Sequence, residues 1–188
     1  MKVVYEHLLK FLIDKPSIKD LSNKLFQLGH EHEIQDSILD IELTPNRGDC
    51  LSLLGLSRDL NVFYKTDLNP PIYNKDIPAL NIDFINKAEK QCPEISFLNI
   101  QIAEQVTEYK DYLNDYFTDL SLNKNNFFTD VSNYIAYEMG QPTHSYDFDS
   151  LDGEIVLKEN NNKQQFSTLL GKDINLNGSE LVFTNKDK

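Results

Sequence analysis

Residues 41–60 read Ile41-Glu42-Leu43-Thr44-Pro45-Asn46-Arg47-Gly48-Asp49-Cys50-Leu51-Ser52-Leu53-Leu54-Gly55-Leu56-Ser57-Arg58-Asp59-Leu60, and the chain is organised around this stretch. Polar and apolar residues alternate from residue 38 to residue 43, which is typical of a half-buried strand. Pro45-Asn46 and Gly48-Asp49 then indicate a tight polar turn, and the leucine-rich segment after them indicates a helix. We therefore predict a strand, a turn and a helix in direct succession.

The predicted helix has a candidate cap at its start. The Asp49 carboxylate can accept hydrogen bonds from the free amides of a first helical turn. An apolar side would then be formed by Leu51, Leu54, Leu60 and Phe63. On spacing alone, the same residues are also explained by a polar turn that only changes the direction of the chain.

Length and composition predict a folded but acidic protein. The chain has 188 residues, of which 40% are hydrophobic, so it can bury a core in one good-sized domain or two small ones. Its formal net charge is -12. A groove that follows phosphates must be locally basic, so strong binding of nucleic acid by this chain alone is disfavoured.

The two cysteines and the amino terminus favour a cytoplasmic protein. Cys50 and Cys92 have no metal-ligand spacing and are best read as free, partly buried thiols, although one disulfide is an alternative. The apolar start, residues 1–12, is interrupted by Glu6, His7 and Lys10, which a signal peptide or a spanning helix tolerates poorly. Secretion and membrane insertion are therefore disfavoured.

Two helices are predicted near the amino terminus. Residues 5–12 form a short helical segment that Pro16 ends. Ser17, with Asp20 three residues later, resembles a capping box, and Gly29 is a natural stop for the helix that follows. The apolar side of this second helix contains Ile18, Leu21, Leu25 and Leu28.

His30-Glu31-His32 follows this second helix. Alternate histidines can form a metal pair, but no third ligand lies nearby in the sequence. We therefore favour a solvated loop and predict no metal site.

The best domain boundary lies in residues 65–78, which are rich in Asp, Asn and Pro and contain Pro70-Pro71. Beyond it, helical spacing of aromatic residues predicts a helix over 107–120. These aromatic side chains are expected in a core rather than in a base-stacking platform, because Asp111, Asp115 and Asp119 accompany them and would repel phosphates. Strands are predicted at residues 80–84, 96–103, 154–158, 166–170 and 180–184, with Gly171 and Asn177-Gly178 as hairpin signals.

A second motif covers residues 129–147 and reads Thr-Asp-Val-Ser-Asn-Tyr-Ile-Ala-Tyr-Glu-Met-Gly-Gln-Pro-Thr-His-Ser-Tyr-Asp. Ser132 or Asn133 can cap a short helix that Gly140 ends, and the turn after it would project His144. A neutral imidazole offers one donor and one acceptor, so His144 could recognise a hydroxyl group or position a water molecule. The alternative is that this histidine lies in a turn packed against a sheet.

Both motifs, in this order, resemble the β subunit of bacterial phenylalanyl-tRNA synthetase. The first resembles the Thr-Pro-Asn-Arg segment of the small domain ahead of its editing domain, and the second resembles the Gly-Gln-Pro-x-His segment of the editing domain. The resemblance implies an α+β chain. It also implies a small amino-terminal α/β domain at residues 1–70 and a partial mixed α/β editing-type domain at residues 71–188.

The family also implies a partner and cofactors. Aminoacylation belongs to the α subunit of an α2β2 heterotetramer, so ATP and Mg would serve the complete enzyme and no cofactor is expected in this chain. A tRNA-binding module is inserted in the family after the helix that ends here at Gly29, and this chain lacks it. Contact with tRNA is therefore expected to be weak or to depend on the complete enzyme.

By resemblance, Ser132, Asn133 and His144 match editing-pocket positions, where tyrosine wrongly joined to phenylalanine tRNA is hydrolysed. The chain departs from the family after Cys92-Pro93, where it has Glu94-Ile95-Ser96, and the family's later Gly-rich and Glu-bearing segments are absent. We therefore expect structural support for the ligase, with at most residual editing by this polypeptide alone. The alternatives are a stand-alone binding module and a free-standing deacylase that uses His144.

Overall fold

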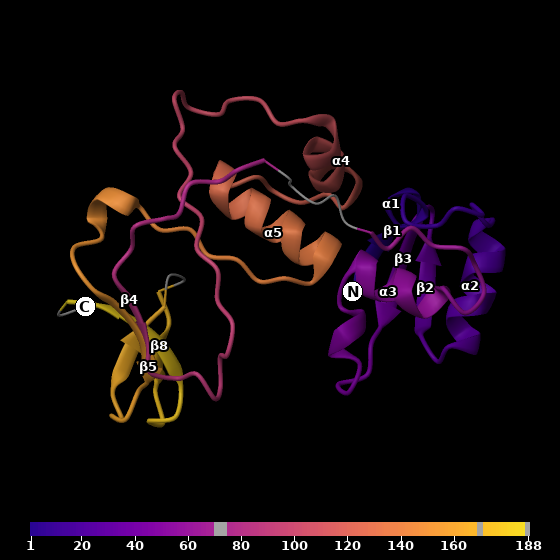
Figure 1. Ribbon diagram of the computed structural model, residues 1–188. Coiled ribbons are helices and arrows are strands. Elements are labelled where there is room, and N and C mark those ends of the chain that lie inside the picture. The colour runs from indigo at the N-terminus through magenta and orange to yellow at the C-terminus, as the bar shows by residue number, and fades with distance from the viewer. Residues whose placement is uncertain (70–74, 169–170, 187–188) are drawn as a thin grey trace. The chain divides into compact units, whose positions relative to one another are not determined.

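The computed structural model describes residues 1–69, 75–168 and 171–186 and confirms an α+β fold (Figure 1). The chain divides into two compact units. Unit 1 contains Met1–Tyr73 and Glu104–Ser145, and unit 2 contains Asn74–Ala103 and Tyr146–Lys188. Pro70 and Pro71, at the middle of the predicted boundary, lie outside the described residues. Residues 104–145 belong to the same compact unit as the amino-terminal segment, so the units are not continuous in sequence.

Unit 1 is an antiparallel three-stranded sheet with helices packed on it. The strand order is β1-β3-β2, so β3 is central, and Asp40 pairs with Lys2 on one side and with Glu33 on the other. The elements are β1 Lys2–Val4, α1 Tyr5–Leu9, α2 Ile18–Gln27, β2 Glu31–Gln35, β3 Ile38–Glu42, η1 Gly48–Cys50, α3 Leu53–Leu60, α4 Asp111–Asp119 and α5 Phe127–Met139.

The predicted start and end of α2 are confirmed. The Ser17 hydroxyl accepts a hydrogen bond from the Asp20 amide, as expected for a helix cap. The helix then ends at Gly29, which has a φ of +85°. Glycine adopts this left-handed conformation at little cost because it has no side chain. On the buried side, Leu21 and Leu25 are fully enclosed.

His30 and His32 do not lie in a solvated loop, so that prediction is wrong. His32 belongs to β2, which pairs with β3 across a two-residue turn, and no module is inserted between these strands. The His30 side chain is buried against α3, and the His32 imidazole contacts the Ser22 hydroxyl at 2.8 Å. The burial of the two histidines could not be predicted from their own segment, because the side chains that enclose them come from α2 and α3.

The core of unit 1 joins residues that are more than a hundred positions apart. It is formed by apolar side chains of α1, α2, β3 and α3 together with an aromatic group from α4 and α5. The expectation that the aromatics of residues 107–120 form a core face is confirmed in part, because Tyr116 and Phe117 are buried in the core and Tyr112 is 47% exposed. The buried members of the core include Val3, Leu8, Leu12, Leu21, Leu25, Leu39, Ile41, Cys50, Leu53, Leu56, Leu60, Leu113, Tyr116, Phe117 and Tyr137.

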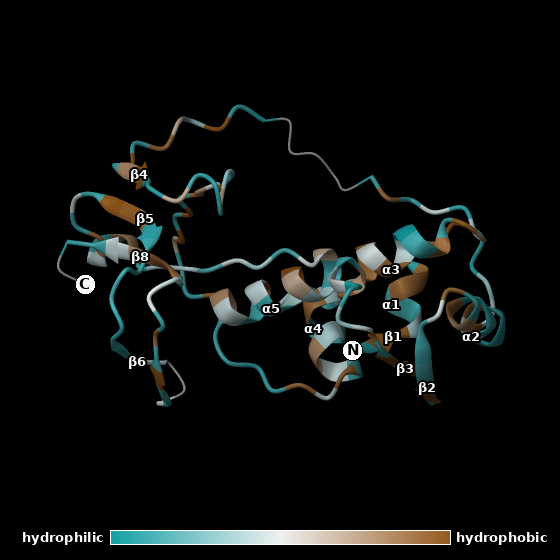
Figure 2. Cartoon of the chain, turned by 90° about the horizontal axis from the view of Figure 1, so that it is seen from below, coloured by the Kyte–Doolittle hydropathy of each residue, from teal (hydrophilic) through white to brown (hydrophobic). Residues whose placement is uncertain are grey.

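Unit 2 contains a small mixed sheet and a separate hairpin. The sheet has the order β4-β5-β8, with β4 parallel and β8 antiparallel to β5. Figure 2 shows hydrophobic residues along β5, its central strand. The elements are β4 Phe84–Asn86, η2 Phe148–Ser150, β5 Ile155–Glu159, β6 Gln165–Ser167, β7 Asp173–Asn175 and β8 Leu181–Asn185.

The strand predictions at residues 154–158, 166–170 and 180–184 correspond to β5, β6 and β8, whereas two others for unit 2 are wrong. Residues 96–103 form no strand, and their Leu98, Ile100 and Ile102 side chains are exposed. An alternating pattern makes a strand only where a neighbouring strand supplies hydrogen bonds, and no strand of the described chain pairs with this segment. The first strand of the unit begins at Phe84 rather than at residue 80.

The hairpin signals are confirmed in part. β6 and β7 form an antiparallel hairpin that includes Gly171, whose φ is +71°. Asn177-Gly178 makes no hairpin, because β8 pairs with β5 and not with β7. Of the helices in the described ranges, none is long and apolar enough to cross a membrane.

Candidate functional site

The Thr-Pro-Asn-Arg segment forms a turn between β3 and α3, as predicted, but its cap differs. The helix begins after Ser52, whose hydroxyl accepts a hydrogen bond from the Gly55 amide at 3.0 Å. Asp49 is therefore not the cap. Its carboxylate instead contacts Arg47 at 3.0 Å and Arg58 at 2.7 Å. The nearby arginines outcompete the backbone amides for this carboxylate, and Arg47 lowers the pKa of Asp49 to about 2.

The buried side of α3 matches the predicted one in part, because Leu60 is buried as predicted. Leu51 is 54% exposed and precedes the helix, whereas Leu53, Leu56 and Leu60 are buried. Leu51 lies outside the helix because the helix begins after Ser52 rather than after Asp49.

Arg47 connects the turn to the protein interior through hydrogen bonds to two buried or half-buried side chains. Its Nη2 atom donates to the Asp59 carboxylate at 2.6 Å and to the Cys50 sulfur at 2.8 Å. On the other side of Asp59, the His30 Nε2 atom lies 3.0 Å from the same carboxylate oxygen. Burial raises the pKa of Asp59, but hydrogen bonds from Arg47 and His30 outweigh it and leave this pKa below its usual value.

His30, Cys50 and Asp59 place potential metal-ligand atoms within 4.8 Å of one another. Two observations oppose a metal ion here. The Arg47 guanidinium already contacts both Cys50 and Asp59, and a cation would have to displace this positive charge. Burial also raises the pKa of the Cys50 thiol to about 12, whereas metals bind the thiolate. The chemistry of the cluster therefore fits a structural ion-pair network.

The second motif forms the longest helix of the described ranges, α5, and the segment after it. Asn126 caps α5 and accepts from the Thr129 amide, so the predicted caps Ser132 and Asn133 lie inside the helix. The helix begins earlier than predicted because its cap, Asn126, lies before the motif at residues 129–147. Gly140 ends it in a left-handed conformation, with a φ of +74°, as predicted.

The three predicted editing residues are only partly brought together. The Ser132 hydroxyl lies 2.6 Å from the Thr143 hydroxyl and donates to the Thr143 carbonyl oxygen, which places it next to the segment that carries His144. Asn133 is exposed on α5, and His144 is exposed in irregular structure. No contact joins the side chains of the three residues to one another in the described structure.

The two motifs that carry the resemblance meet in unit 1. A Cβ atom added at Gly140 would lie 3.1 Å from the Ser52 hydroxyl oxygen and 3.2 Å from the Ser52 Cβ atom. The end of α5 therefore approaches the start of α3 so closely that only glycine fits without adjustment. Segments 88 positions apart in the sequence thus form one packed junction.

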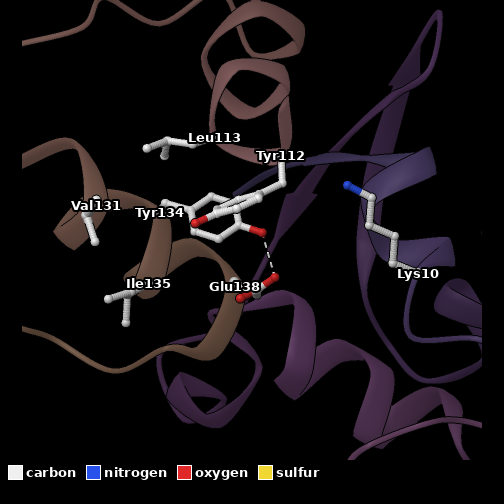
Figure 3. Close-up of a pocket in the computed structure, with 7 residues that line it drawn as sticks. All are labelled: Lys10, Tyr112, Leu113, Val131, Tyr134, Ile135 and Glu138. Atoms are coloured by element: carbon white, nitrogen blue, oxygen red, sulfur yellow. Dashed lines mark hydrogen bonds between the residues drawn. The ribbon is translucent and has the colours of Figure 1, made fainter. Parts of the chain in front are cut away.

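A pocket of unit 1 lies between α1, α4 and α5 and has a volume of about 450 Å³ (Figure 3). None of Ser132, Asn133 and His144 lines it. Its lining residues are Lys10, Tyr112, Leu113, Val131, Tyr134, Ile135 and Glu138. A smaller pocket of about 150 Å³ lies in unit 2, beside β5 and η2, and also excludes the three predicted editing residues.

Comparison with known protein families finds a match for the second half of the chain. Residues 91–188, about half of the chain, match the family described as B3/4 domain. The chain belongs to the B3/4 domain family. The B3/4 region includes the predicted site residues Ser132, Asn133 and His144 and draws on both compact units, whereas Ser52 lies outside it.

Similar proteins extend the B3/4 match towards the amino terminus. The phenylalanine–tRNA ligase β subunit of Psychrobacter arcticus is 32% identical over 79% of this chain, and that of Salinibacter ruber is 33% identical over 79%. These alignments cover 19% and 18% of the two relatives, so the chain spans about a fifth of their length. The resemblance recognised in the sequence is thereby confirmed.

A solved structure also matches this B3/4 chain. It is an N-terminal fragment of the phenylalanyl-tRNA synthetase β subunit from Pyrococcus horikoshii, with 14% sequence identity and a TM-score of 0.39. The match covers 93% of this chain and 50% of that structure.

Proposed function

We propose that this chain acts as the amino-terminal part of a phenylalanine–tRNA ligase β subunit and supports tRNA aminoacylation structurally. The observation that carries the proposal is the close packing of Gly140 on Ser52, which joins the two family-like segments in one unit. Two segments that resemble one family in sequence are expected to share a structural role when they are built into one core.

The partner in this proposal is the ligase α subunit, in an α2β2 assembly located in the cytoplasm. ATP and Mg would be bound by the α subunit, which carries out the aminoacylation. This chain's contact with tRNA would be weak or would depend on the whole assembly, which agrees with its net charge of -12.

The geometry favours a structural role over a catalytic one. The Ser132 hydroxyl is already engaged by Thr143, and the His144 imidazole is exposed to water rather than enclosed with a substrate pocket. Efficient hydrolysis of an ester requires donors that are fixed around the reacting carbonyl and shielded from water. Residual editing through Ser132, Asn133 and His144 therefore remains a secondary proposal.

Purification of the chain from its own cells tests the main proposal. A tag on the chromosomal copy should recover the phenylalanine–tRNA ligase α subunit in a stoichiometric amount, as measured by mass spectrometry and mass photometry. Recovery of the chain without the α subunit would contradict the ligase role and favour the stand-alone binding module.

Release of tyrosine from tyrosylated phenylalanine tRNA tests the secondary proposal. We expect the purified chain to release tyrosine slowly, and we expect His144→Ala to abolish that slow activity. Rapid release by the unmodified chain would overturn the structural role, whereas release that is unchanged in the His144→Ala variant would remove the role of this histidine.

A further inference from the structure

The pocket between α1, α4 and α5 is not used by the proposed editing residues. Val131, Tyr134, Ile135 and Glu138 recur at helical spacing and therefore share one side of α5. At 100° per residue, Ser132 and Asn133 point about 110° and 150° away from the middle of that side. The pocket and the predicted editing residues are therefore separate features of α5.

The walls of this pocket differ in chemical character. Leu113, Val131 and Ile135 form an apolar wall, and the rings of Tyr112 and Tyr134 lie beside it with their centroids 5.2 Å apart. Such a surface suits a flat or branched apolar group, because aromatic rings favour tilted contacts at this separation. A volume of about 450 Å³ lies in the lower part of the range of about 300–1,000 Å³ for small-molecule sites.

Two opposite charges lie at the edge of the same pocket. The Lys10 side chain extends towards the tyrosine rings from the end of α1 (Figure 3). Its ammonium group makes no ion pair or hydrogen bond with any residue that the structure describes. The Glu138 carboxylate accepts a hydrogen bond from the Tyr134 hydroxyl at 2.6 Å through one oxygen, which leaves the second oxygen available.

We propose that this pocket binds a free α-amino acid with a bulky apolar side chain. The α-carboxylate would pair with Lys10, the α-ammonium group would pair with the free oxygen of Glu138, and the side chain would contact the tyrosine rings and the apolar wall. A zwitterion with an apolar body matches one cation, one anion and an apolar surface in a single pocket, whereas a molecule with one charge leaves the other unpaired.

Binding of L-phenylalanine and L-leucine to the full chain tests this proposal, by isothermal titration calorimetry and by amide chemical shifts. We expect saturable binding of both, with shifts centred on α4 and α5 at the pocket. We expect 3-phenylpropionate, which lacks the ammonium group, and phenethylamine, which lacks the carboxylate, to bind at least tenfold more weakly. No saturable binding up to about 10 mM of either amino acid would overturn the proposal.

Matched variants locate the site. Lys10→Gln and Glu138→Gln should each weaken binding at least tenfold, because each removes one charge that the zwitterion uses. Lys19→Gln and Glu108→Gln change exposed residues of the same charges outside the pocket and should leave the affinity unchanged. Circular dichroism establishes that each variant is folded. Equal affinity in all folded variants, or shifts centred elsewhere, would overturn the assignment.

Discussion

At the scale of single residues, Gly55 is fixed by a backbone contact. A Cβ atom at this position would lie 2.1 Å from the Asp49 carbonyl oxygen and 3.0 Å from the Cys50 Cα atom. Backbone atoms of a short helical turn cannot move aside as the end of a side chain can. The glycine therefore allows η1 to pack directly against the first turn of α3.

Gly55→Ala should therefore destabilise the protein, although alanine normally stabilises a helix by about 1 kcal/mol relative to glycine. We expect a loss of about 3 kcal/mol or more in the free energy of unfolding, since the added methyl group must displace backbone. Urea denaturation measures it. Gly48→Ala is the matched control, because a Cβ atom there meets nothing within 4 Å. Equal stabilities of the two variants would contradict the contact.

The His7 side chain on α1 lies between a tyrosine hydroxyl of α5 and a carboxylate of α4. Its Nδ1 atom lies 3.2 Å from the Tyr137 hydroxyl, and its Nε2 atom lies 3.1 Å from the Asp119 carboxylate, outside hydrogen-bond geometry. Burial, and then the nearby Lys10, lower the pKa of His7 below its ordinary value of 6.5, and the attraction of Asp119 opposes them only in part. The neutral form is therefore favoured in the folded protein.

This shift predicts a loss of stability on acidification. Between the pKa of His7 in the folded chain and its ordinary value of 6.5, the unfolded chain binds more protons than the folded one. The free energy of unfolding should therefore fall as the pH drops below 6.5 and should be independent of this group above that value. Denaturation at a series of pH values checks this. His7→Gln should reduce the slope in this window, and His144→Gln, at an exposed position, should keep it; the same slope in both would contradict the assignment.

At the scale of elements, the junction of α3 and α5 joins the two family-like segments. Gly140 combines a positive φ with a close approach to Ser52, whereas Gly29 has a positive φ of +85° and no atom within 4 Å of an added Cβ. The loss of stability in Gly29→Ala should therefore reflect backbone strain alone. The loss in Gly140→Ala should reflect backbone strain together with the contact between α5 and Ser52.

We expect Gly140→Ala to cost about 2–3 kcal/mol and Gly29→Ala to cost about 1 kcal/mol in the free energy of unfolding. The excess at Gly140 should disappear in a Ser52→Gly background, where the hydroxyl and Cβ atoms that meet the new methyl group are gone. Chemical denaturation of the four single and double variants measures this coupling. An excess that persists in the Ser52→Gly background would show that the junction is not the cause.

The elements that the sequence predicted well are those fixed by local chemistry. The Ser17 cap, the glycine ends of α2 and α5, and the strand before Thr44 depend on a few neighbouring residues. The errors have two kinds of cause. Asp49 contacts Arg47 of its own turn and Arg58 of α3 instead of capping the helix, so a nearby charge was overlooked. Residues 96–103 lack a partner strand in the described structure, which the local pattern could not indicate.

The candidate site was predictable to a lesser degree. The sequence singled out Ser132, Asn133 and His144 by resemblance, and whether they edit stays a prediction. It did not predict the pocket that Lys10, Tyr112 and Glu138 help to line, because α1 meets α4 and α5 only in the folded unit. Helical spacing of Val131, Tyr134, Ile135 and Glu138 was the one signal that could have indicated a shared side of α5.

At the scale of the whole molecule, the chain is an acidic α+β protein whose compact units are interleaved in sequence. Unit 1 contains the ion-pair network of Arg47, the motif junction and the pocket. The B3/4 region contributes to both units. The ion pairs of Arg47 and the contact between Gly140 and Ser52 are packing contacts within unit 1, which agrees with the proposal that the chain has a structural role.

The charging of tRNA with phenylalanine tests this account most directly. The activity would be measured on the assembly isolated through a tag on this chain and on the material that the tag leaves behind. The account predicts that phenylalanylation activity is enriched in the isolated assembly in proportion to the chain. Isolation of the chain without activity, with all phenylalanylation in the remaining material, would contradict it.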